Sequence, residues 1–495
     1  MVIELYEKLK QQDSERETLS KLRSLMKEEE EKAKLLHIMG EGALFFALLK
    51  HEDAKTRKNV ALLLGDLQFQ SAKDRLKEAY ETETTRFVKS SYLTALSKLD
   101  VAEDLELFQS WRDKLLALEP AEEEKKHVSE ELHELFRMIV AIEGVKKHTF
   151  KGFEKAHDLL LATNREQREV TLQEVAELSA TIQRKAELHP LGVQVYTKEV
   201  LPITKLRTYR ELLFPIGQET LSATQPKVAA EMLLKNGICD ILEECHKEAA
   251  PFYFRVEIKA AEPQMEYAKK FSQALEQISG YKLINAVKDY EIEIRLIQAK
   301  EGGFAAFLKL KTIPMKRFAY RKNAISMSIH PATAAMMMRL AKPYLKENAQ
   351  ILDPCCGVGT MLVERNICVP AKEIYGIDIF GDAILGAREN STLAGCKVNY
   401  IHRDFFDFKH DYLFDEIITN MPVRGKKSKE EQDAFYEQFF RKASTLLSDD
   451  GKIIMYTTES AFVKKQLRLH AEFWLNQEFV IRKKEGFYLY IITKR

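Results

Sequence analysis

The chain has few cysteines for its length, and none of them forms the pairs that a zinc ribbon or a disulfide framework requires. Six cysteines are spread over 495 residues, and no two stand in a Cys-x-x-Cys arrangement. No run of eighteen apolar residues occurs, which argues against a membrane-spanning helix. The first residues also lack the apolar segment and small-residue cleavage site of a secretory signal. These absences predict a cytoplasmic protein.

The chain lacks an excess of charge of either sign. Its 76 Lys and Arg residues and 75 Asp and Glu residues give a net charge of +1, which excludes a histone-like polycation and an acidic tail protein. Residues 1–140 nevertheless carry a net charge of −6, so the remainder carries +7. A polyanionic partner is therefore expected to bind the later part of the chain.

Residues 1–140 contain a single proline, and their apolar residues recur at helical spacing. One apolar face is repeated 32 residues later in the chain; its two copies are Val60, Leu63, Leu64, Leu67 and Tyr92, Ala95, Leu96, Leu99. A helix-pair repeat of this length favours an all-α, HEAT-like repeat domain over residues 1–140, with a plain helical bundle as the alternative. Either fold predicts a scaffold or docking surface for a protein partner, because no pattern of catalytic residues occurs here.

Residues 141–322 have the pattern of an α+β module. Alternating runs at 253–259, 291–298 and 304–313 predict strands, and an apolar stripe predicts a helix over 262–280. The module ends in residues 309–322, which contain six basic residues, no acidic residue and two aromatic residues. Basic side chains neutralise phosphates and aromatic rings stack on bases, so this tract predicts RNA contact through Lys316, Arg317, Arg321 and Lys322. A solvated edge strand leading into a linker is the alternative.

Residues 323–495 alternate between short apolar strands and helices. The predicted strands are 349–356, 373–378, 399–404, 415–420 and 452–457, and the predicted helices are 359–367, 380–395, 431–447 and 459–470. Two further β-rich runs, 473–485 and 487–494, are joined only by Gly486 and must pair antiparallel. The pattern predicts an α/β, Rossmann-like doubly wound sheet with a reversed last strand, and a ligand site at the carboxyl ends of its strands.

The first of these strands runs into a glycine turn. Residues 353–360 read DPCCGVGT, and Gly357 and Gly359 allow the backbone to approach a ligand closely. A dinucleotide-binding turn would have a third glycine where Leu362 stands, and a phosphate-binding P-loop would end in Gly-Lys-Ser/Thr. The turn therefore favours a small nucleoside ligand without phosphate.

Polar residues end the next strands. Asp378 is placed to accept hydrogen bonds from a ribose diol, and Asp404 is expected beside an adenine, although each could instead cap a helix. The fourth strand ends in Asn420-Met-Pro422, where a side-chain oxygen and a backbone carbonyl could grip a conjugated amino group. Pro422 fixes φ and stiffens that geometry. An ordinary turn between strand and helix is the alternative.

The DPCCGVGT turn together with Asn420-x-Pro422 resembles class I S-adenosylmethionine-dependent methyltransferases that modify exocyclic amines. The closest likeness is to the THUMP-domain RNA methyltransferases that make N2-methylguanine in tRNA; residues 279–296 and 317–341 also resemble segments of that family. The resemblance implies that residues 141–322 form a ferredoxin-like, THUMP-like RNA-binding region and that residues 323–495 form the methyltransferase domain, after the helical domain that periodicity predicts over residues 1–140. It also implies S-adenosyl-L-methionine as cofactor and RNA, in particular tRNA, as partner. It assigns Asn420 and Pro422 to catalysis and implies a cofactor site formed by Asp353, Cys356, Gly357, Gly359, Thr360, Asp378, Asp404 and Asn420.

This sequence departs from the family pattern at two places. About 140 helical residues precede the part that resembles the family, and Val423 stands where the family commonly has an aromatic residue that stacks on the base. Phe405, Phe406 or Tyr436 could supply that contact instead. Two other functions stay open: an RNA-binding assembly factor with an inactive methyltransferase fold, and an amine methyltransferase that acts on DNA or on protein glutamine.

Overall fold

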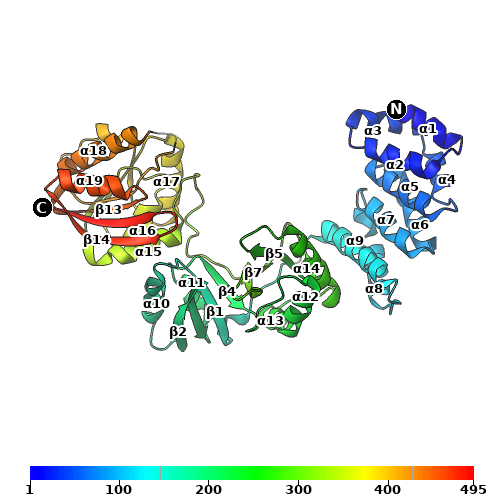
Figure 1. The fold of residues 1–495 in the computed structure, drawn as a ribbon, viewed down its shortest axis with the longest axis horizontal. Coiled ribbons are helices and arrows are strands. Elements are labelled where there is room, and N and C mark those ends of the chain that lie inside the picture. Colours follow the sequence, from blue (N-terminus) through cyan, green and yellow to red (C-terminus); the bar gives the residue numbers. More distant parts are fainter. Residues whose placement is uncertain (145–146, 426–427) are drawn as a thin grey trace. The chain divides into compact units, whose positions relative to one another are not determined.

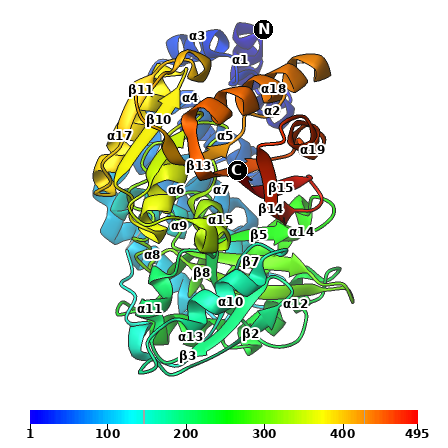
Figure 2. The ribbon, with the colours of Figure 1, turned by 90° about the vertical axis from the view of Figure 1, so that its left-hand side faces the viewer.

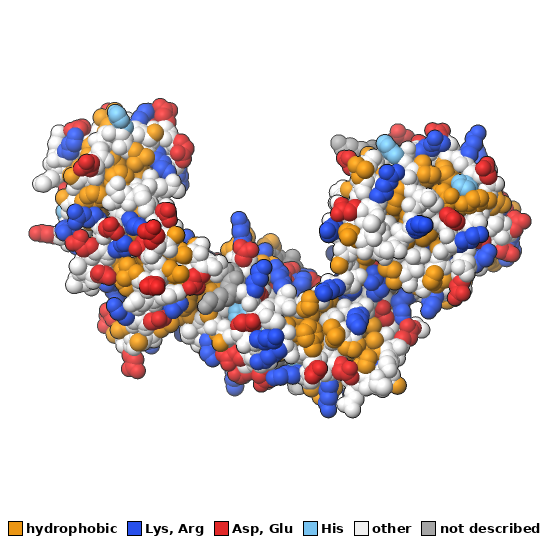
Figure 3. Space-filling view, turned by 180° about the vertical axis from the view of Figure 1, so that it is seen from behind, with side chains coloured by type: hydrophobic (Ala, Val, Ile, Leu, Met, Phe, Trp, Pro, Cys, Tyr) orange, Lys and Arg blue, Asp and Glu red, His pale blue; other side chains and the backbone are white. Residues whose placement is uncertain are grey.

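The computed structural model describes residues 1–144, 147–425 and 428–495, which form two compact units (Figure 1). The first unit comprises Met1–His148, Ala250–Arg255 and Lys269–Glu291, and the second comprises Thr149–Ala249, Val256–Ala268 and Ile292–Arg495. On the face shown in Figure 3, acidic and basic side chains are interspersed, in keeping with the near-zero net charge. In the described part of the chain, no helix is both long and apolar enough to cross a bilayer.

Residues 1–144 contain helices and no strand. The helices are α1 (Val2–Lys10), α2 (Glu15–Leu25), α3 (Glu29–Met39), α4 (Ala43–Leu48), α5 (Ala54–Asp66), α6 (Lys73–Thr82), α7 (Arg86–Leu96), α8 (Leu105–Leu116) and α9 (Lys125–Glu143). The apolar face that recurs in the sequence is buried in both α5 and α7. These two helices approach closely, because a Cβ atom on Gly65 would lie 2.6 Å from the Cα atom of Ala95. The HEAT-like assignment stays a prediction.

The core of the first unit extends beyond its N-terminal helices. It includes Tyr253 at the start of β5 (Phe252–Lys259), Tyr281, which follows α14 (Met265–Ile278), and Ile284 in β6 (Leu283–Asn285). The Tyr281 ring stacks on Phe136 of α9 at 5.2 Å and 23°. β5 and β6 pair in parallel. Segments far apart in the sequence therefore share one apolar core.

The central part of the second unit contains a mixed set of strands and helices. Its strands are β1 (His157–Ala162), β2 (Arg184–His189), β3 (Gly192–Thr197), β4 (Glu211–Pro215), β7 (Ile292–Gln298) and β8 (Phe304–Leu310). They pair antiparallel in the order β2-β3-β1-β4-β8-β7. The helices are α10 (Arg168–Ala176), α11 (Val200–Lys205), α12 (Pro226–Lys235) and α13 (Ile238–Cys245). An α+β arrangement is thus present, whereas its assignment as a THUMP module stays a prediction.

The C-terminal part of the second unit is an α/β sheet with helices on both faces (Figure 2). Its strands are β9 (Gln350–Asp353), β10 (Glu373–Asp378), β11 (Asn399–His402), β12 (Phe414–Asn420), β13 (Leu447–Thr457), β14 (Phe473–Arg482) and β15 (Phe487–Lys494). The order is β11-β10-β9-β12-β13-β15-β14, with β15 antiparallel to both of its neighbours. The last strand is therefore the reversed one, as the sequence predicts.

Helices cover the two faces of this sheet in two groups. α15 (Pro331–Ala341), α16 (Thr360–Cys368) and α17 (Gly381–Leu393) contribute to one apolar cluster, and α18 (Lys429–Leu446) and α19 (Ser460–Leu469) contribute to another. Buried apolar strands between two helical layers leave only the strand ends for polar chemistry.

Charged side chains join the central and C-terminal parts of the second unit. The Arg207 guanidinium contacts both carboxylate oxygens of Glu364 in α16, at 3.0 and 2.7 Å, and the Tyr320 hydroxyl donates to the same carboxylate at 2.6 Å. Because Glu364 is 1% exposed, this pairing is shielded from water. It fixes the segment that leads into β4 beside the C-terminal sheet.

Candidate functional site

A cavity of about 950 Å³ opens at the carboxyl ends of the parallel strands in the C-terminal sheet. Residues from β9, β10, β12 and β13 line it, together with the 325–330 segment, Arg210, and two residues of the terminal hairpin, Arg482 and Phe487. Its volume is near the upper end of the range for small-molecule sites, about 300–1,000 Å³. The cavity therefore has room for more than one small group.

The glycine turn forms one wall of the cavity. Gly357 and Gly359 have φ values of +51° and +79°, which disfavour residues with a side chain. A Cβ atom on Gly357 would meet only the Ile325 side chain at 3.9 Å, whereas one on Gly359 would lie 2.2 Å from the Tyr400 hydroxyl oxygen. Gly357 thus leaves space beside the backbone for a ligand, and Gly359 is required by packing.

Asp378, at the end of β10, holds this turn. Its carboxylate accepts hydrogen bonds from the Gly357 N–H at 2.8 Å and from the Phe380 N–H at 2.9 Å. A carboxylate has about four lone-pair sites, so two remain for a ligand. The half-buried side chain lines the cavity, as a ribose-binding residue must. That role stays a prediction.

Asp353 and Cys356 are the buried residues of the turn. Asp353 is 1% exposed and accepts a hydrogen bond from the Cys355 N–H at 3.1 Å. Burial raises the pKa of the Asp353 carboxyl well above its usual range, and the charge of Asp378 adds to the rise. Burial likewise raises the pKa of the Cys356 thiol. Cys356 is therefore suited to packing rather than to nucleophilic attack.

Thr360 provides a buried polar atom at the wall of this cavity. It is the first residue of α16 and only 3% exposed, and its hydroxyl makes no hydrogen bond with the described residues. An unsatisfied buried hydroxyl is costly unless a ligand or water pairs with it. The glycine turn, Asp378 and Thr360 therefore fit a polar ligand such as a nucleoside.

Asn420 ends β12 and lines the same cavity. No hydrogen bond joins its side-chain amide to any described residue. The backbone around it is fixed, because the Met421 N–H donates to the Tyr456 carbonyl at 3.0 Å and the Gln432 amide donates to the Pro422 carbonyl at 3.2 Å. The turn thus presents a free amide on a rigid support. Val423 also lines the cavity and is 39% exposed.

Asp404 lies outside the residues that line the cavity. Its exposed carboxylate accepts a hydrogen bond from the Phe406 N–H at 2.9 Å and caps the short helical turn Phe405–Asp407. This is the capping role that the sequence left open, and contact with an adenine stays a prediction.

The aromatic residues expected to compensate for Val423 also lie away from the cavity lining. Phe405 packs against Phe439 in the core, and the buried Tyr436 bonds to the Thr457 hydroxyl at 2.6 Å. Phe406 contacts Phe435. Tyr456, Phe487 and Phe380 are the aromatic residues that line the cavity.

The four residues of the 309–322 tract that the sequence predicts to contact RNA fall into two classes. Lys316 and Lys322 are exposed. Arg317 instead lies over the Tyr209 ring at 3.6 Å and donates to the carbonyls of Leu206 and Arg210, at 2.8 and 3.0 Å. Arg321 donates to the Ile329 carbonyl at 3.3 Å. RNA contact through these residues stays a prediction, and the two arginines have structural partners.

Sequence reasoning missed Arg210, Tyr456, Arg482 and Phe487 as residues of the site. Arg210 comes from a segment more than 100 residues before the glycine turn, and no motif marks it. The hairpin turn at Gly486 could have indicated Arg482 and Phe487. Because the last strand runs antiparallel to its neighbour β13, it begins at the edge of the sheet where the parallel strands end, and that edge carries the site.

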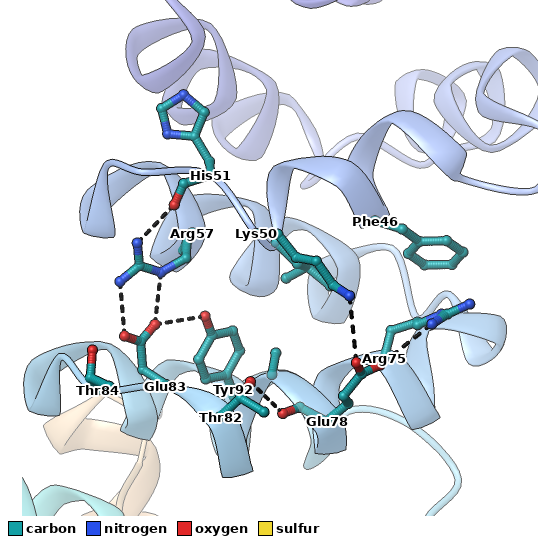
Figure 4. A pocket seen from close by; sticks show the side chains of 12 residues that line it. Phe46, Lys50, His51, Arg57, Arg75, Glu78, Thr82, Glu83, Thr84 and Tyr92 are labelled. Carbon is teal, nitrogen blue, oxygen red and sulfur yellow. Dashed lines mark hydrogen bonds and ion pairs between the residues drawn. The ribbon is translucent and has the colours of Figure 1, made fainter.

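The first unit contains a smaller cavity of about 300 Å³ between its helices (Figure 4). Arg57 contacts both carboxylate oxygens of Glu83 at 2.8 Å, and the Tyr92 hydroxyl donates to Glu83 at 3.0 Å. Lys50 and Arg75 both pair with Glu78. These charges satisfy one another, which is typical of structural pairing between helices.

Comparison with known proteins agrees with the α/β fold of the C-terminal part. Residues 319–483 match the UPF0020 family, described as RMKL-like, methyltransferase domain. The resemblance to class I methyltransferases and their α/β fold is thus confirmed for the C-terminal part.

The chain is 30% identical over 131 residues to a tRNA (guanine(10)-N2)-dimethyltransferase of Methanothermobacter thermautotrophicus. That match covers 26% of this chain and 38% of the relative, so the chain aligns with well under two thirds of the relative's length.

Two solved structures are similar over most of the chain. TrmN from Thermus thermophilus is 22% identical with a TM-score of 0.52, and the match covers 68% of this chain and 99% of TrmN. SMU.472, solved as a complex with SAH, is 16% identical with a TM-score of 0.51, and the match covers 69% and 99%. These likenesses establish the fold. The expected cofactor, S-adenosyl-L-methionine, is supported by the methyltransferase domain match and by that complex.

Proposed function

We propose that this chain transfers a methyl group from S-adenosyl-L-methionine to an exocyclic amino group of an RNA base, specifically guanine N2 in tRNA, in the cytoplasm. The observation that carries the proposal is the free Asn420 amide, which lines one cavity with the glycine turn and Asp378. The match to a methyltransferase domain supports the reaction class. The tRNA dimethyltransferase relative supports the substrate.

The part of the cavity formed by Asp378, Gly357 and Thr360 binds and orients the cofactor. Bound S-adenosyl-L-methionine supplies an electrophilic methyl group on a positively charged sulfonium. Asp378 offers its two remaining lone-pair sites to a ribose diol, and the open space at Gly357 admits the ligand against the backbone. Thr360 offers a buried hydroxyl that gains a partner on binding.

The substrate half of the cavity positions an amine. The Asn420 side-chain oxygen and a backbone carbonyl of the turn accept hydrogen bonds from the two N–H groups of the amine, which favours a pyramidal nitrogen whose lone pair can attack. As the new N–C bond forms, the bond from the methyl carbon to sulfur breaks, S-adenosylhomocysteine leaves, and the amine releases one proton to solvent. Pro422 keeps the turn rigid, and its carbonyl is held by Gln432. Since no strong general base is needed, catalysis consists of positioning and electrostatic stabilisation.

Asn420→Ala tests this assignment. It removes one of two acceptors for the amine, and the loss of one preorganised polar contact lowers kcat by about 10²–10³. Affinity for S-adenosyl-L-methionine should stay unchanged, as should affinity for tRNA, which phosphate contacts dominate. The measurement is transfer of labelled methyl to unmodified tRNA, with identification of N2-methylguanosine after digestion.

Asn399→Ala, at an exposed asparagine of β11, is the matched control and should keep full activity. Wild-type rates in the Asn420 variant would refute the role of the amide. If the wild-type protein binds RNA tightly but methylates neither RNA nor DNA nor protein glutamine, the assembly-factor alternative replaces the enzyme.

A further inference from the structure

The cavity continues beyond Asn420 to four side chains that the proposed methyl transfer does not use. They are Arg210, Tyr456, Arg482 and Phe487, here called the aromatic–arginine cluster. They come from the segment before β4, from β13 and from the terminal hairpin.

The order of the strands places three members of this cluster, Tyr456, Phe487 and Arg482, on the far side of Asn420 from the proposed cofactor residues. Asp378 is on β10, two strands from Asn420 on β12, with β9 between them. On the other side, Tyr456 of β13 is directly paired with Asn420. Because neighbouring strands lie about 4.8 Å apart, Tyr456 is within reach of any group held by the Asn420 amide.

The aromatic members of the cluster form one stacked pair. The rings of Tyr456 and Phe487 lie 4.9 Å apart at an interplanar angle of 18°. Tyr456 is 4% exposed and Phe487 is half-buried, so the pair is fixed by packing while it borders the cavity. A rigid ring face beside an amine-holding amide is suited to a planar base.

The two arginines supply positive charge next to this ring face. Arg482 lies over Phe487 at 5.6 Å and pairs with it across the hairpin. Arg210 donates to the Thr333 hydroxyl at 3.0 Å. Among the described residues, neither arginine has a carboxylate partner within ion-pair distance. Two guanidinium groups without an ion-pair partner at a cavity wall favour an anionic ligand such as a phosphodiester.

We infer that the aromatic–arginine cluster binds the nucleotide whose base presents its amine to Asn420. The Tyr456–Phe487 pair stacks on the base, and Arg210 and Arg482 contact the adjoining phosphates. The inference rests on the proposed function and adds the residues that select the substrate. It also accounts for Val423, because the stacking face lies on β13 and the terminal hairpin rather than on the turn after Asn420.

The test compares the full chain with Phe487→Ala, Phe487→Tyr and Arg482→Ala. Each protein is assayed for kcat and KM on unmodified tRNA, for S-adenosyl-L-methionine affinity by calorimetry, and for RNA affinity against salt with SAH bound. Phe487→Ala should lower kcat/KM about 5- to 150-fold, the range that base stacking gives, with cofactor affinity unchanged. Phe487→Tyr should restore it. Arg482→Ala should lower the log–log salt slope by about 0.7–0.9.

Two neighbouring substitutions serve as matched controls. Tyr488→Ala removes a half-buried aromatic residue next to Phe487, and Lys483→Ala removes an exposed cation next to Arg482; neither residue lines the cavity. Tyr488→Ala thus measures the cost of disturbing β15. Both controls should retain the wild-type kcat/KM and salt slope for folded protein.

Failure of the inference and failure of the proposed function give different results. If the wild type methylates tRNA and the Phe487 and Arg482 variants match it, the cluster does not bind the nucleotide although the function stands. If the wild type transfers no methyl group, the function fails, and the RNA affinities with SAH bound then decide on the cluster: unchanged affinity and slope refute it. Equal methylation of a DNA strand of the same sequence would overturn the assignment to RNA.

Discussion

At the scale of single residues, Asp378 holds the glycine turn in place and also lines the cavity. Its two hydrogen bonds hold the Gly357 and Phe380 amides, and its remaining lone pairs face the cavity. The same carboxylate therefore fixes the shape of the turn and could receive a ribose. A residue with two such tasks should affect ligand binding more than its single proposed contact implies.

Asp378→Ala should weaken S-adenosyl-L-methionine binding by about 1–3 kcal/mol, because the ribose diol would be left without its acceptor. Calorimetry on the full chain measures the change, and a thermal melt shows whether the turn still folds. Asp407→Ala, at an exposed carboxylate outside the cavity, is the control and should bind as the wild type does. Unchanged affinity in the Asp378 variant would contradict a ribose contact.

At the scale of elements, the basic tract at 309–322 is divided between solvent and structure. Composition alone predicts that all basic residues of the tract contact RNA, because it does not show which of them form hydrogen bonds within the protein. Arg317 stacks on Tyr209 and binds two carbonyls, whereas Lys316 and Lys322 are exposed. Only the exposed lysines are available to phosphates without loss of an internal contact.

The two classes should respond differently to substitution. Lys316→Ala combined with Lys322→Ala should flatten the salt dependence of RNA binding by about 0.7–0.9 per lost phosphate contact and leave stability unchanged. Arg317→Ala should lower the free energy of unfolding by about 1–3 kcal/mol, because it removes a cation–π contact and leaves two carbonyls unpaired. Salt-dependent binding and denaturant melts measure the two effects. A destabilised double-lysine variant with an unchanged salt slope would reverse this assignment.

At the scale of the whole molecule, local patterns predicted the C-terminal sheet well. The strands from β9 to β13 are apolar runs separated by helical patterns, and β14 and β15 are joined by a turn in which Gly486 has a positive φ. The strands β1 to β4 were not predicted individually. In β2, Arg184–His189, exposed and half-buried residues follow one another without a clear apolar face, so the sequence gives no strand signal there.

Only those residues of the cavity that belong to local sequence motifs were predicted. The glycine turn, Asp378 and Asn420 each end a recognisable strand. Arg210 reaches the cavity because Arg207 pairs with Glu364, a contact between residues 157 positions apart, and no short-range pattern encodes it. A contact of this kind forms only when the chain has folded and brought the two distant segments together.

The mixed composition of the first unit gives a prediction for the whole chain. Tyr281 stacks on Phe136 and donates to the Ser129 hydroxyl at 2.9 Å, so removal of residues 1–148 would expose Tyr253, Tyr281 and Ile284. The shortened chain should melt at a lower temperature and aggregate more readily, because buried apolar area becomes solvent-exposed. Every residue that lines the 950 Å³ cavity belongs to the second unit, so methyl transfer per folded molecule should persist. Thermal melts, light scattering and transfer assays on both chains measure these effects. A shortened chain that melts like the wild type would contradict the shared core, and a folded but inactive one would mean that the N-terminal helices take part in binding the substrate.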